Sequence, residues 1–234
     1  MRSCNRRSLV KEPAMRITHV RLPCTDVAAG LAFYREVLQL PAGTDHVRIG
    51  WSRLELTPGA EVGSVHLAFN LPPVRFDAAC DWLSQRAAPL SDAQGTTRFA
   101  LGGAWQSQSV YFAGPDGAVL ELIARAPLPA QPAFQGAFSA HELQCISEVG
   151  LPSTQVPAVV ATAQQEIGLH PLQVPSAQFA ALGDHTGLLI VVDTQRRWFP
   201  QQQQLPFAHG VEVVVDGVRP GQVLRDAAGW EVRS

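Results

Sequence analysis

Four ionisable side chains in the first half of the sequence have residue types and spacings that suit a divalent metal ion. Each lies in a short segment that alternates with apolar residues; the four are His19, Glu55, His66 and Glu121. Side chains alternate across a strand with period two, so each polar residue falls on the face opposite its apolar neighbours. Imidazoles and carboxylates bind Zn²⁺, Fe²⁺, Ni²⁺ or Mn²⁺, and two His with one carboxylate form the ligand set of oxygen-activating iron. The pattern predicts one metal site where the four polar faces meet.

The chemistry of such a site is Lewis-acid catalysis on a small oxygen-bearing molecule, with a carboxylate that moves a proton. Glu121 and Glu55 are the candidate bases. Arg21 and Arg53 share strand faces with the predicted ligands and could bind a substrate carboxylate or phosphate, although an ion pair with a neighbouring Glu is the more frequent role. Tyr111 could stack on a planar substrate, against its more usual place in a core.

The elements that must position these residues follow a pattern that occurs twice. A strand at 17–22 precedes a helix whose apolar residues recur at helical spacing from Val27, and two short strands follow. The pattern restarts with a strand at 64–70, a capped helix at 77–86 and a hairpin over 109–125 with a Gly-Pro-Asp-Gly turn. We therefore predict an α+β fold of tandem β-α-β-β-β units.

Changes in composition divide the chain into four parts. Residues 1–14 are predicted to be a flexible leader without the apolar core of a secretory signal, and 15–126 hold the two units. Residues 127–142 are rich in Pro, Ala and Gln, which favours a linker. In 143–234 the stretch Ile-Ser-Glu-Val-Gly-Leu-Pro at 146–152 repeats the start of the first unit, and a shortened fourth unit follows. We expect a second, reduced domain there.

Acids occupy the positions of the second domain that the repeat aligns with the two histidines. Glu148 corresponds to His19 and Glu212 to His66. Acids without an imidazole suit a hard cation better than a transition metal. The second domain is therefore predicted to be structural or to shape a cleft.

Composition excludes several classes of function. The 234 residues are 46% hydrophobic and 16% charged, which is typical of a globular protein. A net charge of -2 without clustered Lys or Arg in the body argues against a nucleic-acid or membrane-surface partner. No apolar run approaches the roughly 18 residues of a membrane span. The four cysteines are scattered, which favours reduced thiols in a cytoplasmic protein.

Three motifs resemble the glyoxalase/bleomycin-resistance/extradiol-dioxygenase superfamily, the vicinal oxygen chelate proteins. They are AFYREVL at 32–38, VHLAF at 65–69 and SVYFAGPDGAVLELIAR at 109–125. The stretches HLAFNLP at 66–72 and GLLIVV at 187–192 further resemble a two-domain subgroup. The resemblance implies two glyoxalase-like domains built as incomplete barrels whose concave faces hold a metal.

The resemblance also implies roles for individual residues. His19, His66 and Glu121 match the common metal ligands of the superfamily, and Glu55, within LELT, matches the fourth ligand of the glyoxalase I branch. The implied cofactor is a divalent metal, Fe, Ni, Zn or Mn.

Two functions stay open on this basis. The first is a metal-dependent lyase, isomerase or extradiol-type dioxygenase that acts on a small molecule. The alternative is a metal-free protein that binds a small molecule or antibiotic, as bleomycin-resistance proteins do, with the four residues as ordinary polar lining. A shortened fourth unit would leave an unpaired sheet edge, so a homodimer is also expected.

Overall fold

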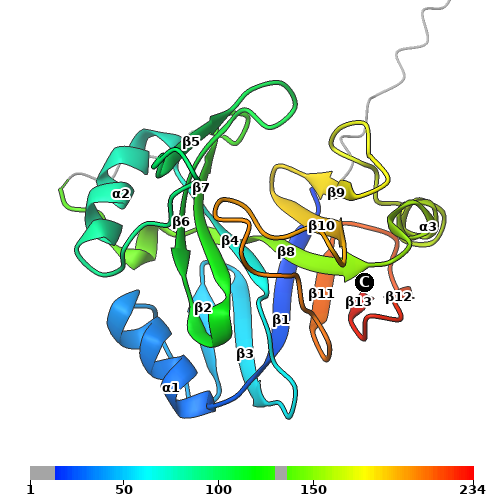
Figure 1. Ribbon diagram of the computed structural model, residues 1–234, viewed down its shortest axis with the longest axis horizontal. Helices are drawn as coiled ribbons and strands as arrows, with labels where there is room; N and C mark the ends of the chain where they lie inside the picture. The colour runs from blue at the N-terminus through cyan, green and yellow to red at the C-terminus, as the bar shows by residue number, and fades with distance from the viewer. Residues whose placement is uncertain (1–13, 130–135) are drawn as a thin grey trace, which may run out of the picture.

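Two mixed β-sheets that share one hydrophobic core make up the molecule (Figure 1). The computed structural model describes residues 14–129 and 136–234. The predicted leader, apart from Ala14, and the middle of the predicted linker lie outside these residues. The order of strands and helices confirms the α+β class and the tandem units. One of the two sheets curls into a half-barrel, which confirms the incomplete barrel.

Among the residues that the structure describes, sheet A has six strands and sheet B has seven. In spatial order, sheet A consists of β12 (Val223–Arg225), β13 (Glu231–Arg233), β11 (Glu212–Asp216), β1 (Arg16–Cys24), β3 (Ser52–Pro58) and β2 (His46–Ile49). Sheet B consists of β5 (Arg98–Leu101), β6 (Ser107–Ala113), β7 (Val119–Arg125), β4 (His66–Leu71), β8 (Cys145–Ser153), β10 (Gly187–Asp193) and β9 (Phe179–Asp184).

Within the described ranges, three short α-helices accompany the sheets. They are α1 (Val27–Ala32), α2 (Phe76–Ser84) and α3 (Val156–Thr162). The chain continues as a π-helical turn after α1 (Phe33–Val37) and after α3 (Ala163–Ile167), and short 3₁₀ turns lie at Pro73–Arg75, Pro115–Gly117 and Ala140–Glu142. Asp26 caps α1, because its carboxylate accepts a hydrogen bond from the backbone N–H of Ala29 at 2.9 Å. None of the helices in the described ranges has the length and apolar composition needed to cross a bilayer.

Each sheet draws strands from both halves of the chain. In sheet A, β1 of the first unit pairs antiparallel with β11 of the fourth unit. In sheet B, β4 of the second unit pairs antiparallel with β8 of the third unit. The first unit therefore shares its sheet with the fourth, and the second unit shares its sheet with the third.

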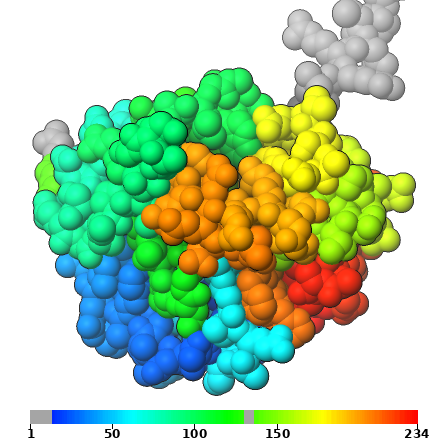
Figure 2. Space-filling view, viewed as in Figure 1, coloured from blue at the N-terminus to red at the C-terminus, as the bar shows by residue number. Residues whose placement is uncertain are grey.

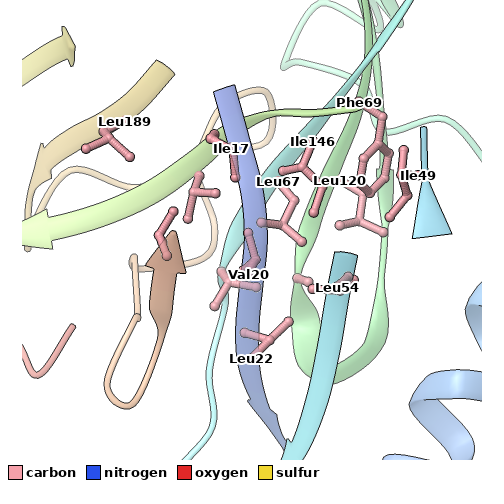
Figure 3. Packing of buried hydrophobic residues seen from close by; sticks show 14 of the residues in the cluster. Ile17, Val20, Leu22, Ile49, Leu54, Leu67, Phe69, Leu120, Ile146 and Leu189 are labelled. Atoms are coloured by element: carbon pink, nitrogen blue, oxygen red, sulfur yellow. The ribbon is translucent and has the colours of Figure 1, made fainter. Parts of the chain in front are cut away.

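The apolar faces of both sheets meet in the core (Figure 3). Ile17 and Val20 of β1 pack there with residues of sheet B such as Leu67, Phe69 and Leu120, all at most 1% exposed. Strict alternation along the strand would place Ile17 on the outer face together with His19, but Ile17 is 0% exposed in the core. A β-bulge between the two residues shifts the register and turns Ile17 inward.

A buried hydroxyl joins the two sheets inside this core. Ser52 Oγ donates to the carbonyl of Ile17 at 2.7 Å and accepts from the N–H of Ile146 at 3.0 Å. Since the core lies between the sheets, their polar faces point away from each other. The polar residues of β1 and β3 are thus separated by the core from those of β4 and β7.

Candidate metal centre and its cavity

Three adjacent strands of sheet B place one imidazole and two carboxylates at a common point. His66 begins β4, Glu121 lies on β7 and Glu148 lies on β8. Ala68 of the central strand pairs with Glu121 on one side and with Glu148 on the other. Because the side chain of Ala68 is a single methyl group, both carboxylates can approach His66, two residues along the same face.

The three ligand atoms lie close together and away from solvent. His66 Nε2 is 3.3 Å from Glu148 Oε2 and 3.5 Å from Glu121 Oε2. All three residues are buried, and their candidate ligand atoms lie within 4.8 Å of one another. His66 Nδ1 is 3.0 Å from the carbonyl oxygen of Val119. A carbonyl only accepts, so Nδ1 donates, and the lone pair of a neutral imidazole is directed from Nε2 toward the carboxylates.

A buried arginine compensates part of the negative charge. Arg125 on β7 is 0% exposed and forms an ion pair with Glu148 through Oε1, the oxygen that does not face His66. Its guanidinium carbon lies 5.6 Å from the ring centroid of Trp105. Nε and Nη1 of Arg125 have no hydrogen-bond partner among the described residues. Arg125 thereby holds Glu148 in place with its second oxygen directed toward His66.

The pKa values of the three groups reflect burial and mutual interaction. Burial and the carboxylate of Glu148 raise the pKa of Glu121 to about 7. Burial also acts to raise the pKa of Glu148, but Arg125 and His66 outweigh it and the pKa is lowered. Burial acts to lower the pKa of His66, but the two glutamates outweigh it and the pKa is raised. Of the two glutamates, Glu148 therefore has the stronger preference for its ionised form.

The donor set fits a divalent metal ion. One imidazole with an available Nε2 and two carboxylate oxygens, all buried and within reach of a common point, are the ligand types used for Zn²⁺, Fe²⁺, Ni²⁺ and Mn²⁺. The hydrogen bond from Nδ1 to Val119 is the support that metal-binding histidines ordinarily have.

The candidate metal centre lies at the bottom of a cavity of about 480 Å³. This volume is within the range of small-molecule binding sites. All seven strands of sheet B contribute to its lining, which consists of His66, Phe99, Leu101, Trp105, Tyr111, Glu121, Ile123, Glu148, Gln173, Ser176, Gln178, Phe179, Ile190, Arg196, Trp198 and Phe199. The glutamines and Ser176 are exposed, whereas the metal-binding group is buried. The cavity therefore has a polar rim, neutral apart from Arg196, and a floor of ionisable groups.

Aromatic side chains form most of the wall between rim and floor. Phe99 and Phe199 lie 4.6 Å apart between ring centroids in an edge-to-face arrangement, and Tyr111 lies 5.3 Å from Phe199. Such a wall favours a ligand with a flat apolar surface.

The segment after β10 covers one side of the cavity. Figure 2 shows this segment, in orange, across the front of the molecule between the green region of β5 to β7 and the yellow region near β9. Trp198 on this segment lies 5.3 Å from His66 between ring centroids, and its Nε1 donates to the carbonyl of Ser64 at 2.9 Å. Gly150 makes room for it, because a Cβ at this position would lie 2.5 Å from the Trp198 ring.

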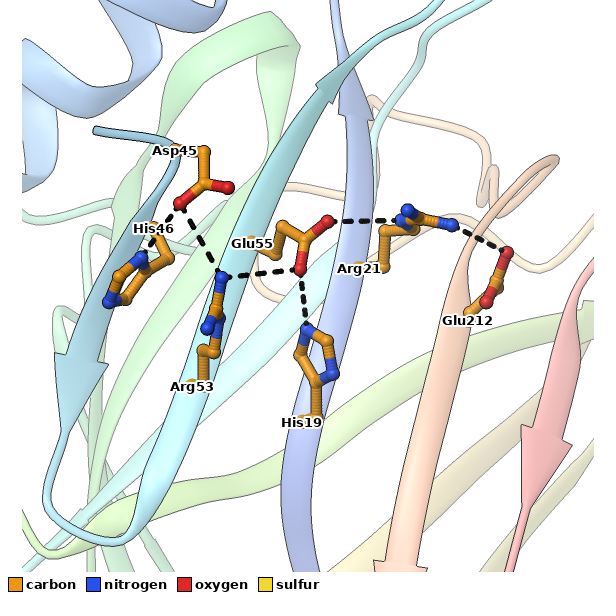
Figure 4. A network of polar contacts seen from close by, with 7 residues as sticks. All are labelled: His19, Arg21, Asp45, His46, Arg53, Glu55 and Glu212. Carbon is orange, nitrogen blue, oxygen red and sulfur yellow. Dashed lines mark hydrogen bonds and ion pairs between the residues drawn. The ribbon is translucent and has the colours of Figure 1, made fainter. Parts of the chain in front are cut away.

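The structure does not bring the four predicted ligands together. His66 and Glu121 meet in sheet B, but His19 and Glu55 lie on the outer face of sheet A (Figure 4). The prediction of a single point of convergence fails because the first and second units contribute to different sheets. Among the described residues, the groups able to hold a metal include neither His19 nor Glu55.

Glu55 is already surrounded by basic side chains. Its carboxylate lies 3.1 Å from His19 Nε2, 3.2 Å from Arg21 Nε and 3.5 Å from an Arg53 guanidinium nitrogen. Arg21 also pairs with Glu212 at 3.3 Å. The more frequent role considered for the two arginines, an ion pair with Glu55, is thus the one that the structure shows.

Tyr111 lines the cavity, so its predicted contact with a substrate stays a prediction. Three other residues of the site were not predicted as functional: Glu148, Arg125 and Arg196. For Glu148 the repeat gave a signal, since it aligns with His19. The sequence pattern did not show that the second unit pairs with the third, which is what brings Glu148 beside His66.

Comparisons with known proteins agree with this architecture. No family model matches the sequence, and no curated protein matches it. Among solved structures, glyoxalase I from Zea mays matches with a TM-score of 0.56 and 16% identity, covering 95% of this chain and 92% of its own. A candidate dioxygenase from Bacillus subtilis matches with a TM-score of 0.55 and 17% identity, covering 87% of this chain and 71% of its own. The chain therefore shares the fold of these two structures, which is the glyoxalase-like fold that its motifs predicted.

Proposed function

We propose that this protein is a divalent-metal-dependent enzyme of the lyase, isomerase or dioxygenase type that acts on a small oxygen-bearing molecule. The observation that carries the proposal is the buried group of His66, Glu121 and Glu148 at the floor of the 480 Å³ cavity. Buried charged groups are costly unless they are paired or bind metals, so such a group at the base of a cavity is a candidate for chemistry. Fe, Ni, Zn and Mn all suit these donors.

His66, Glu121 and Glu148 would hold the ion. A bound divalent ion supplies Lewis-acid polarisation of substrate oxygen atoms. Glu148 is fixed by Arg125, whereas His66 is the sole basic side chain in the described ranges that forms an ion pair with Glu121. Glu121 is therefore the carboxylate that would take up and return a proton, through an oxygen that does not hold the ion. Glu55, the other base predicted from the sequence, lies outside this cavity and has no part in the proposal.

The cavity walls would bind and orient the substrate. The aromatic side chains of Phe99, Tyr111 and Phe199 exclude water and offer flat surfaces. A small molecule is the partner that this cavity volume suits. The homodimer and the cytoplasmic location stay predictions from the sequence.

Metal titration of chelator-stripped protein tests the proposal. We expect the parent chain to bind one Mn²⁺ or Zn²⁺ ion, measured by isothermal titration calorimetry, and Glu148→Gln to bind it about tenfold more weakly or worse. Glu212→Gln is the matched control, since the repeat aligns Glu212 with His66 but its carboxylate pairs with Arg21 in sheet A. A parent chain that binds no metal, or equal losses in both variants, would contradict the proposal and favour a metal-free binding cleft.

A further inference from the structure

Arg196 lines the cavity and forms no ion pair with a carboxylate of the part of the chain that the structure describes. No other Lys or Arg lines the cavity within the described ranges. The side chain is partly buried, and its guanidinium carbon lies 4.8 Å from the ring centroid of Phe179. Burial lowers the pKa of Arg196, and Tyr111, not a carboxylate of the described residues, acts against this shift. Arg196 therefore bears a desolvation cost that no carboxylate of the described residues offsets.

Its neighbour in sequence shows the contrast. Arg197 is exposed, donates to the backbone carbonyl of Gln203 and does not line the cavity. The remaining polar residues at the rim, Gln173, Ser176 and Gln178, are neutral. Arg196 is thus the rim group suited to an anion, and it is held against an aromatic ring that keeps the guanidinium beside the cavity.

The charges of the cavity fix the direction in which an anionic ligand would lie. In the ion-free cavity, Glu121 and Glu148 make the floor unfavourable for a negative group, whereas Arg196 makes the rim favourable. The aromatic wall between them suits a planar body.

We propose that Arg196 binds the acidic group of a planar aromatic anion whose ring system packs against the aromatic wall of the cavity. The anionic group accepts hydrogen bonds from the guanidinium, and the opposite end of the ligand points toward the floor. This inference deepens the proposed function by naming the substrate class of the same cavity, but the anion contact itself does not require a metal. Arg196 acts in it as a specificity residue.

A pair of fluorescent probes isolates the anion contact. 1-Anilinonaphthalene-8-sulfonate and N-phenyl-1-naphthylamine have the same aromatic rings, and the first carries a sulfonate. We expect the ratio of their dissociation constants to shift against the sulfonate by about tenfold in Arg196→Gln, because a hydrogen-bonded charge pair is lost. Arg197→Gln is the matched control and should keep the parent ratio. Arg196→Lys should retain part of the preference.

The inference is overturned if Arg196→Gln weakens both probes equally, leaves both unchanged, or matches Arg197→Gln. Metal titration of the same proteins separates it from the proposed function. If no metal binds but the sulfonate preference depends on Arg196, the anion site stands and the metal proposal fails. If metal binds normally and the preference is independent of Arg196, the anion site alone fails.

Discussion

At the scale of single residues, Arg125 is the side chain on which the two buried glutamates depend. It is fully buried, pairs with Glu148 and lies over Trp105. Without it, Glu148 and Glu121 would face each other in a nonpolar environment with His66 as their remaining cation in the described structure. Removing one partner of a buried pair leaves an uncompensated charge, which is far more costly than breaking an exposed pair.

Arg125→Leu should therefore destabilise the metal-free protein by about 3–5 kcal/mol in urea unfolding followed by circular dichroism. Arg53→Leu, whose partner Glu55 lies on the outer face of sheet A, should cost less than about 1 kcal/mol. Equal losses of stability in the two variants would show that Arg125 does not compensate the negative charge of the buried glutamates.

A divalent ion should return part of the stability lost in Arg125→Leu. Its charge replaces that of the guanidinium beside the two carboxylates, and an ion that binds only the native state stabilises it by mass action. The measurement is the shift in melting temperature on adding Mn²⁺ to stripped protein. A smaller increase in melting temperature in Arg125→Leu than in the parent would argue against the idea that the ion and Arg125 interact with the same carboxylates.

At the scale of elements, local patterns predicted most helices and strands but not how the strands pair. The helix predicted from Val27 is present as α1 and the π-helical turn that follows, and the hairpin over 109–125 is present as β6 and β7. These elements depend on spacing and turn residues within a few positions. The bulge at Ile17 and the pairing of β4 with β8 arise from packing between distant segments, so they could not be predicted from local sequence patterns.

The same distinction explains what was predicted of the site. His66 and Glu121 stand out because each interrupts an apolar alternation on its own strand. Glu148 also lies on a strand, but its role depends on which unit lies beside it. Arg196 lies in a segment without periodicity, so its place at the cavity could not be predicted from the sequence pattern.

The contact between β8 and the segment after β10 gives an element-scale prediction. Gly150→Ala should displace Trp198 from His66 and cost about 1–3 kcal/mol, because the added Cβ would lie 2.5 Å from the indole. Gly102→Ala is the control, since nothing lies within 4 Å of its added Cβ. Urea unfolding measures both, and equal midpoints for the two variants would contradict the tight contact.

At the scale of the whole molecule, the two halves of the chain are joined through both sheets. Strands β1 and β11 link the halves in sheet A, and β4 and β8 link them in sheet B. One apolar core lies between the sheets and includes residues of both halves. Neither half holds a complete sheet, so we expect the chain to unfold as one unit.

Fluorine NMR of protein labelled with 5-fluorotryptophan tests this expectation. Trp82 lies in α2 of the first half, and Trp230 lies next to β13 in the second half and donates to the carbonyl of Pro152 at 2.7 Å. Both native resonances should disappear at the same urea concentration. Two separate midpoints would show that the halves unfold as independent domains.

The most direct test of the account is the metal content of three proteins purified without chelator or metal-affinity tag. We expect the parent chain and His19→Ala to carry about one Fe, Ni, Zn or Mn ion each, because His19 lies in sheet A, and His66→Ala to carry none. The measurement is elemental analysis by mass spectrometry on folded, monodisperse samples. Loss of the metal from His19→Ala, or its retention in His66→Ala, would contradict the assignment of the metal centre to sheet B.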